Sequence, residues 1–187
     1  MSYVEEFKSA VSRSNENGID VTFPLIKRKP YLDKKTLNKY SRFFSQKFTD
    51  IGYEAFKGQC LAISQATHEY LEEKVKIPSI LTFGYVVLDD DDYFKQDENF
   101  YSALVRNPSR KQSENIHAWV TLTSGEIIDP TFATSYAYAH GIEEMKGSVV
   151  SGYADKLNKG MSYHPMIVGS DFLIKAGFIR IGRFALT

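Results

Sequence analysis

A short β-hairpin is the feature that most restricts the fold of this 187-residue chain. Residues 116–122 and 126–129 are rich in apolar and β-branched side chains, and a Thr-Ser-Gly turn at 123–125 separates them. Such runs on either side of a glycine-containing turn are typical of paired antiparallel strands. Residues 80–88 form a longer apolar, β-branched run, which predicts a buried strand. We therefore expect a sheet in the second half of the chain.

Helices are expected before these strands. Ser2 and Glu5 have the spacing of a capping box, and the apolar residues that follow predict a helix over 3–15. Apolar stripes predict two more helices, over about 35–49 and 59–74. In the third helix the positions expected to be buried are Leu61, Ile63, Ala66, Tyr70 and Leu71. Helices followed by strands predict an α+β fold with an antiparallel sheet.

The remaining segments give weaker signals. Residues 89–115 predict a long loop with a short helix near 100–105, and the acidic run that opens it predicts a solvated turn, because it lacks the glycine and glutamate of a calcium-binding EF-hand loop. No element is predicted for 131–165. A short helix over 170–177 and a last strand over 178–184 are expected. The length suits one domain, residues 1–187.

Composition excludes several classes of protein. The 23 Lys and Arg residues balance the 23 Asp and Glu residues, so we expect neither a nucleic-acid nor a membrane partner. A single cysteine excludes an intramolecular disulfide framework. There is no secretory signal and no apolar run long enough to span a membrane, which favours a cytoplasmic protein, although export by a dedicated apparatus would leave no mark in these features. No phosphate-binding loop is present, so no nucleotide cofactor is expected.

Three short motifs carry the chemistry. Gly58-Gln59-Cys60 places a thiol at the start of the third helix, where free N–H groups and the helix dipole favour a thiolate and offer donors to an oxyanion. His117 lies in the first strand of the hairpin and Asp129 ends the second. Each has an ordinary structural explanation: a buried thiol, a hydrogen-bonded histidine, a strand terminator. Together they supply a nucleophile, a base and a carboxylate that orients the base.

The turn decides whether His117 and Asp129 can meet. With a two-residue turn, Asp129 would lie opposite Val120, and the two side chains would point to opposite faces of the sheet. With a three-residue turn that has Gly125 in the left-handed conformation, Asp129 lies opposite Trp119 and diagonal to His117, at about 7–8 Å between Cα atoms. The catalytic interpretation therefore requires an odd-numbered turn.

These motifs resemble those of the transglutaminase-like superfamily of papain-type cysteine enzymes. The Gly-Gln-Cys triplet resembles the nucleophile motif of transglutaminases, and His117-Ala-Trp119 and Asp129-Pro-Thr resemble segments of bacterial transglutaminase-like proteins and arylamine N-acetyltransferases. The resemblance covers about residues 56–132, with a core of about 50–135 and terminal elaborations. It implies N-terminal helices, a nucleophile helix packed on an antiparallel sheet, and Cys60, His117 and Asp129 as a catalytic triad.

The resemblance also implies the function. Cys60 would attack a carboxamide or peptide carbonyl of a protein or peptide substrate and form a thioester, with Gln59 and Trp119 as candidates for oxyanion or substrate binding. Hydrolysis by a protease or glutamine deamidase is the first expectation, and acyl transfer to an amine is the second. Leu61 follows the cysteine where transglutaminases usually carry an aromatic residue.

Two other functions remain open. Cys60, His117 and Asp129 have side chains that could ligate zinc. Alternatively, the chain is a non-catalytic interaction module in which the thiol is buried and inert. His68, His140 and His164 compete poorly with His117 as the base, since His68 lies roughly 12 Å from Cys60 along the helix axis.

Overall fold

The structure, a computed structural model, describes residues 1–25, 30–33, 35–39, 43–44, 46, 52, 54, 58–109, 111, 114–158 and 160–179. The strands are β1 (Ser79–Leu88), β2 (Asp91–Tyr93), β3 (His117–Leu122), β4 (Glu126–Asp129), β5 (Val150–Tyr153) and β6 (Met161–Val168). The helices are α1 (Tyr3–Glu16), α3 (Cys60–Tyr70), α4 (Glu98–Arg106), α5 (Phe132–His140) and α6 (Asp171–Lys175). A π-helical turn η2 (Leu71–Val75) continues α3, and two 3₁₀ turns are η3 (Glu143–Met145) and η4 (Ala154–Lys156).

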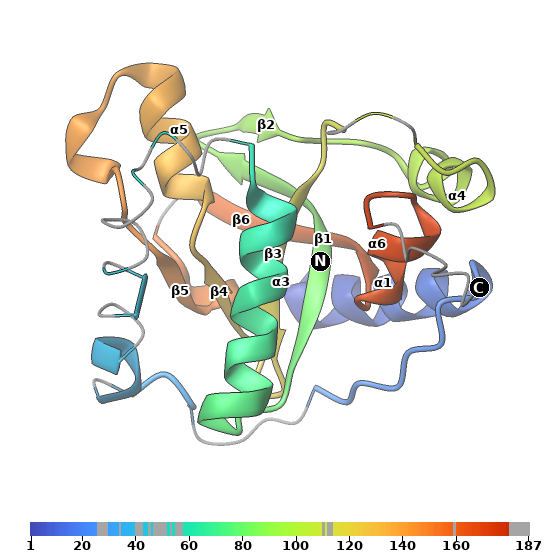
Figure 1. Ribbon diagram of the computed structural model, residues 1–187, viewed down its shortest axis with the longest axis horizontal. Coiled ribbons are helices and arrows are strands. Elements are labelled where there is room, and N and C mark those ends of the chain that lie inside the picture. The colour runs from blue at the N-terminus through green and yellow to red at the C-terminus, as the bar shows by residue number, and fades with distance from the viewer. Residues whose placement is uncertain are drawn as a thin grey trace, which may run out of the picture.

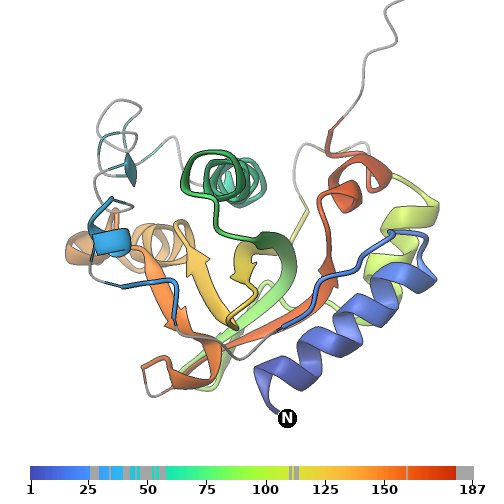
Figure 2. The ribbon, with the colours of Figure 1, turned by 90° about the horizontal axis from the view of Figure 1, so that it is seen from below.

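All six strands form one antiparallel sheet, which confirms the predicted α+β class. The order is β2-β1-β3-β4-β5. β3 and β2 pair with successive parts of one edge of β1, and β6 pairs along the opposite edge. The sheet curls into a half-barrel, with α3 inside its curve and α1 outside (Figures 1 and 2).

The hairpin of β3 and β4 has the odd-numbered turn that the site requires. Val120 pairs with Ile128 and Thr121 with Ile127, so the next pair in this register sets Asp129 opposite Trp119. Gly125 has a φ of 83°, the left-handed conformation that glycine adopts without strain. The prediction that His117 and Asp129 share a face is therefore confirmed.

Helix α3 packs on β3 through small hydroxylated residues. Its buried residues are Cys60, Ser64 and Thr67. Of the positions predicted to be buried, Leu71 is buried, three are half-buried and Ala66 is exposed, so the predicted face was wrong at Ala66; the half-buried three are Leu61, Ile63 and Tyr70. Ser64 donates a hydrogen bond of 2.8 Å to the Ala118 carbonyl oxygen, and Thr67 donates one of 2.7 Å to a carbonyl of its own helix. Because both hydroxyls are satisfied, the polar residues can be buried.

Helix α1 covers the opposite face of the sheet. Its capping box is present as predicted, with Ser2 and Glu5 bonding to each other's backbone. The buried hydroxyl of Tyr3 accepts a hydrogen bond of 2.8 Å from the Trp119 indole and lies 2.6 Å from the Thr121 hydroxyl. These bonds fix the helix to the middle of β3.

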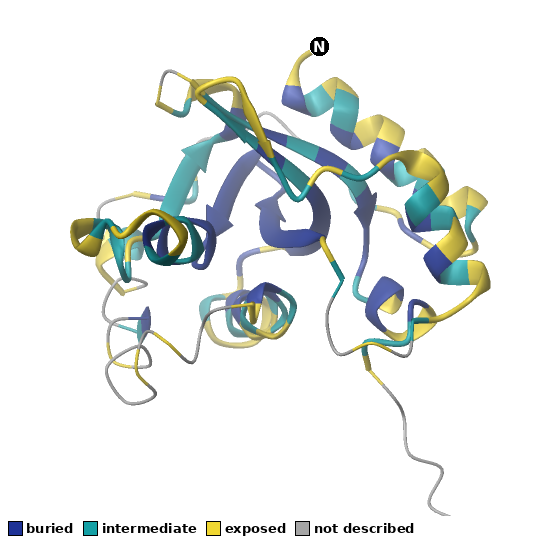
Figure 3. Ribbon diagram, turned by 90° about the horizontal axis from the view of Figure 1, so that it is seen from above, coloured by how far each residue is buried: buried dark blue, intermediate teal, exposed yellow. Residues whose placement is uncertain are grey.

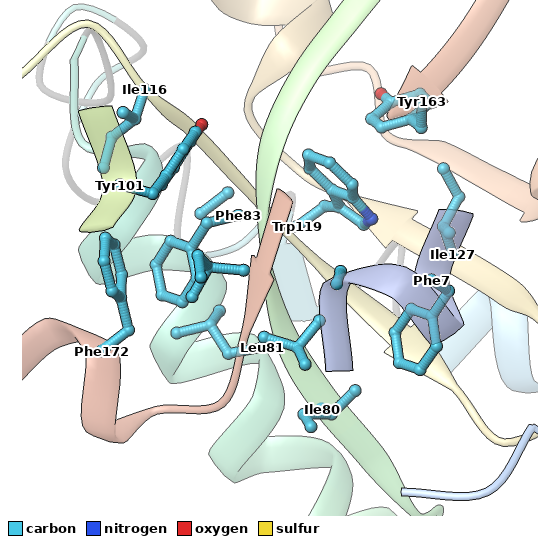
Figure 4. Packing of buried hydrophobic residues seen from close by; sticks show 14 of the residues in the cluster. Phe7, Ile80, Leu81, Phe83, Tyr101, Ile116, Trp119, Ile127, Tyr163 and Phe172 are labelled. Carbon is cyan, nitrogen blue, oxygen red and sulfur yellow. The ribbon is translucent and has the colours of Figure 1, made fainter. Parts of the chain in front are cut away.

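The larger hydrophobic cluster lies between the sheet, α1, α4 and α6. Figure 4 shows part of it, and the rings of Trp119 and Tyr163 meet edge to face with centroids 5.0 Å apart. A smaller cluster joins Val120, Leu122 and Ile128 to Leu71. Figure 3 shows that burial is concentrated in the central strands.

Close packing of β1 also depends on a glycine. Gly84 pairs with His117 of β3 and lies at an irregularity in the pairing with β6. A Cβ atom at Gly84 would lie 2.0 Å from the His164 carbonyl oxygen and 2.8 Å from the Trp119 ring. No other residue fits there without moving the backbone of β6.

Several segments differ from the sequence prediction. The expected loop over 89–115 contains the predicted short helix as α4. It also contains β2, which pairs with β1 and is too short, at three residues, to show a periodic pattern in the sequence. Residues 131–165, for which nothing was predicted, contain α5, β5 and the start of β6. The helix over 170–177 is confirmed as α6.

Two predicted elements lie partly outside the described residues. Of the helix over 35–49, the described residues 35–39, 43–44 and 46 are helical. Of the strand over 178–184, the structure describes residues 178–179, which form a bend. Among the described residues, no helix is both long and apolar enough to cross a membrane.

Candidate active site

Cys60 is the first residue of α3, as the sequence predicts. Gly58 has a φ of 73°, which lets the chain turn into the helix without strain. The first intrahelical hydrogen bond runs from the Ile63 N–H to the Gln59 carbonyl oxygen. The N–H groups of residues 60–62 therefore precede the helical bonding pattern and give this end of the helix a partial positive charge.

The thiol lies at the wall of a pocket of about 550 Å³. Its lining includes Gln59 and Leu61 at the start of α3, together with Ile116 and Leu173. Cys60 is 9% exposed, and its Sγ lies 3.6 Å from the Ile116 carbonyl oxygen, to which it donates a weak hydrogen bond. The nucleophile is thus mostly covered but borders a cavity large enough for a side chain.

His117 occupies the first position of β3 and is completely buried. Its Nε2 lies 2.5 Å from Oδ2 of Asp129, so one ring nitrogen is fully engaged. Its Nδ1 is buried and makes no hydrogen bond of good geometry with any residue of the described chain. Cys60 nevertheless contributes to the raised pKa of His117, and Nδ1 is the ring nitrogen that is not bonded to Asp129.

Asp129 is held by five donors. Its Oδ1 accepts hydrogen bonds from the Thr131 N–H at 2.9 Å, the Thr131 hydroxyl at 3.1 Å and the Phe132 N–H at 3.0 Å. Its Oδ2 accepts from His117 and, at 2.9 Å, from the Tyr163 hydroxyl. A buried carboxylate with this many donors remains ionised and fixed in orientation.

The electrostatics favour a charged His117. Burial disfavours the imidazolium, but the Asp129 carboxylate and its hydrogen bond outweigh this effect and Cys60 adds to it, so the pKa of His117 is raised to about 10. Burial likewise opposes ionisation of Asp129, and His117 together with the backbone donors nevertheless lowers its pKa. The Asp129 carboxylate therefore makes His117 a strong base, and the pair becomes an imidazolium and a carboxylate once Nδ1 of His117 has accepted a proton.

Aromatic rings enclose the imidazole. Phe94 stacks on His117 with centroids 5.0 Å apart and an interplanar angle of 19°, and Phe132 meets it edge to face at 5.7 Å. Phe94 has a φ of 64°, which is rare for a bulky residue and keeps its ring over His117. Sequence reasoning missed both residues, since neither lies in a recognisable motif.

The two remaining predicted site residues differ in position. Gln59 is exposed, precedes α3 and lines the pocket beside Cys60, a position open to substrate. Trp119 is completely buried, and its indole donates a hydrogen bond to the Tyr3 hydroxyl. Among the described residues, it does not line the pocket at Cys60. A direct contact between Trp119 and substrate is not supported by this position, and its indole instead supports β3.

The other histidines are engaged elsewhere. His68 is bonded to the Ser79 hydroxyl at 2.8 Å, and His164 is paired with Glu6 at 2.8 Å. His140 is exposed and stacks on an aromatic ring of its own helix. This leaves His117 as the histidine that the structure brings to Cys60.

The zinc alternative lacks support in the described part of the chain, where no group of three His, Cys, Asp or Glu residues is arranged to hold a metal ion. Comparison with protein-family models, with curated proteins and with solved structures found no match. The function is therefore inferred from the geometry of the site.

Proposed function

We propose that this protein is a cysteine-dependent enzyme that attacks a carboxamide or peptide carbonyl through a thioester intermediate. The observation that carries the proposal is the bonded pair of His117 and Asp129, whose ring is influenced by Cys60 and whose Nδ1 is buried without a hydrogen-bond partner among the described residues. We also propose a papain-like, transglutaminase-like architecture, supported by the order of a helix-start cysteine, a strand histidine and an aspartate on the neighbouring antiparallel strand.

The chemistry follows from these positions. The thiol proton passes to Nδ1 of His117, and the thiolate attacks the carbonyl carbon and forms a C–S bond. The N–H groups at the start of α3 are the donors available to the resulting oxyanion. When the C–N bond breaks, the imidazolium gives its proton to the departing amine or ammonia. Asp129 holds the imidazole in orientation throughout.

We propose water as the group that resolves the thioester. Water needs no binding site of its own, whereas an amine acceptor does, and the described residues place one pocket at Cys60. In this step His117 takes a proton from water while the water oxygen bonds to the acyl carbon; the C–S bond then breaks, the acid leaves, and His117 returns the proton to the Cys60 thiolate. The reaction is then hydrolysis or deamidation of a protein or peptide, and it needs no cofactor.

The first test is the pH dependence of iodoacetamide alkylation, measured by intact mass. Cys60 is the only thiol, so each added carbamidomethyl group reports on it alone. We expect native protein to be alkylated faster than urea-unfolded protein at pH 6–7, and His117→Ala to remove this advantage. His140→Ala is the matched control, because it removes an exposed histidine.

Alkylation that is slower in the native than in the unfolded chain at every pH would contradict the proposal and favour an interaction module with an inert thiol. If the thiol is activated, incubation with glutamine-containing peptides separates the reactions. Ammonia release indicates deamidation, shorter peptides indicate proteolysis, and cross-linking to an added amine indicates transfer.

A further inference from the structure

Tyr163 joins the site from a strand that the sequence motifs do not include. It lies on β6, 34 residues after Asp129, and is buried. Its hydroxyl donates to Oδ2 of Asp129 at 2.9 Å, and the same oxygen is bonded to Nε2 of His117. One carboxylate oxygen is therefore shared by the imidazole and a phenol.

The position of Tyr163 is set independently of Asp129. Its backbone pairs with Val86 of β1, on the opposite edge of that strand from β3. Its ring meets Trp119 edge to face at 5.0 Å and Phe132 at 6.3 Å. Because packing holds the ring in place, the hydroxyl is a fixed donor rather than one that follows the carboxylate.

We propose that Tyr163 is a positioning residue for the thiol chemistry proposed above: its hydroxyl shares Oδ2 of Asp129 with His117 and so sets how strongly the carboxylate holds the imidazolium. A carboxylate with too few donors is a stronger base and retains the imidazolium proton more tightly. A donor on the same oxygen weakens this hold, so His117 can release its proton to the departing amine.

The environment of the pair makes the effect measurable. The titratable groups that act on His117 are Asp129 and Cys60, and those that act on Tyr163 are Asp129 and Tyr3. Burial and the neighbouring carboxylate raise the pKa of Tyr163 far above its ordinary value, so it stays a neutral donor throughout the titration of His117. A change in its hydrogen bond therefore appears as a change in the pKa of His117.

The experiment is a histidine NMR titration of wild type and two variants in opposite directions. The chain has four histidines, and His117→Ala assigns the relevant signal. Tyr163→Phe removes the donor, and we expect the pKa of His117 to rise by about 0.5 or more. Replacing Tyr163 with 3-fluorotyrosine provides a stronger donor and should lower it.

Tyr3→Phe is the matched control. It also removes a buried, hydrogen-bonded hydroxyl, but one that bonds to Thr121 and Trp119 instead of Asp129. We expect the pKa of His117 to be unchanged in this variant, and thermal melting to show whether each variant is folded. If Tyr163→Phe does not fold, the fluorotyrosine variant carries the test alone.

An unchanged pKa of His117 in the Tyr163 variants, or an equal shift in Tyr3→Phe, would overturn the proposal. Its failure is distinguishable from failure of the proposed function. If the pKa responds as expected while Cys60 is no more reactive than in the unfolded chain, Tyr163 acts on the pair but the protein is not a thiol enzyme.

Discussion

Replacing Asp129 with asparagine changes the charge of the site without changing its size. The new amide oxygen can still accept from the N–H groups of Thr131 and Phe132, which directs the NH₂ group toward His117 and Tyr163. Two donors then face each other unless His117 moves its ring proton from Nε2 to Nδ1. A neutral imidazole with its proton on Nδ1 can no longer accept the thiol proton of Cys60.

The magnitude follows from the bond that is lost. A hydrogen bond to a charged group contributes about 1.5–3 kcal/mol, and one pKa unit corresponds to about 1.4 kcal/mol. We therefore expect the pKa of His117 to fall by about 1–2 in Asp129→Asn. The alkylation rate of Cys60 near pH 7 should fall by about 10- to 100-fold, because each pKa unit that His117 loses disfavours proton transfer from the Cys60 thiol about tenfold.

The assay is iodoacetamide alkylation read by intact mass, with circular dichroism to confirm folding. Asp155→Asn is the control, because this exposed carboxylate accepts a backbone hydrogen bond from Tyr3 at 2.7 Å and is not bonded to His117 or Asp129. A folded Asp129→Asn variant that is alkylated at the wild-type rate would refute the claim that the carboxylate sets the state of His117.

Three further predictions concern stability. Because the pKa of His117 is raised, the pair stabilises the fold fully below about pH 6.5 and progressively less toward pH 10. Because the pKa of Asp129 is lowered, its contribution is complete above about pH 3.8. In urea unfolding, wild type should therefore be more stable than Asp129→Asn by a margin that is about 1–3 kcal/mol larger at pH 5.5 than at pH 9. Gly84→Ala places a methyl group against the backbone of β6, so we expect a loss of about 3 kcal/mol or more, and a melting temperature within a degree of wild type would contradict this. Ser64→Ala removes a buried bond to a β3 carbonyl, and the free energy of unfolding should fall by about 1–2 kcal/mol.

The parts of the fold that the sequence predicts are those with a local signal. The capping box of α1, the apolar run of β1 and the glycine turn after β3 each depend on neighbouring residues, and all three are confirmed. The strand β2 has only three residues and is held by its pairing with β1, and β5 is held by its pairing with β4. Strands of this kind are defined by partners distant in sequence, so local patterning does not reveal them.

The site divides in the same way. The contact between His117 and Asp129 was predictable because the turn length sets the register of their strands, whereas the place of Cys60 beside them was expected from the resemblance. Tyr163 and Phe94 were not, because one reaches the pair across β1 and the other through an unusual backbone angle. Trp119 lies in the expected motif, but its indole turns to Tyr3 and supports the strand.

The energetics of the pair argue for a function. Burying an ionised His117 and Asp129 carries a desolvation penalty, and well-packed apolar residues of similar volume are often at least as stable in such positions. Nδ1 of His117, which has no hydrogen-bond partner among the described residues, adds the cost of an unsatisfied buried polar atom. Neither cost is explained by folding alone. Both are explained if Nδ1 is reserved for the proton of Cys60 and the carboxylate keeps the ring charged once that proton arrives.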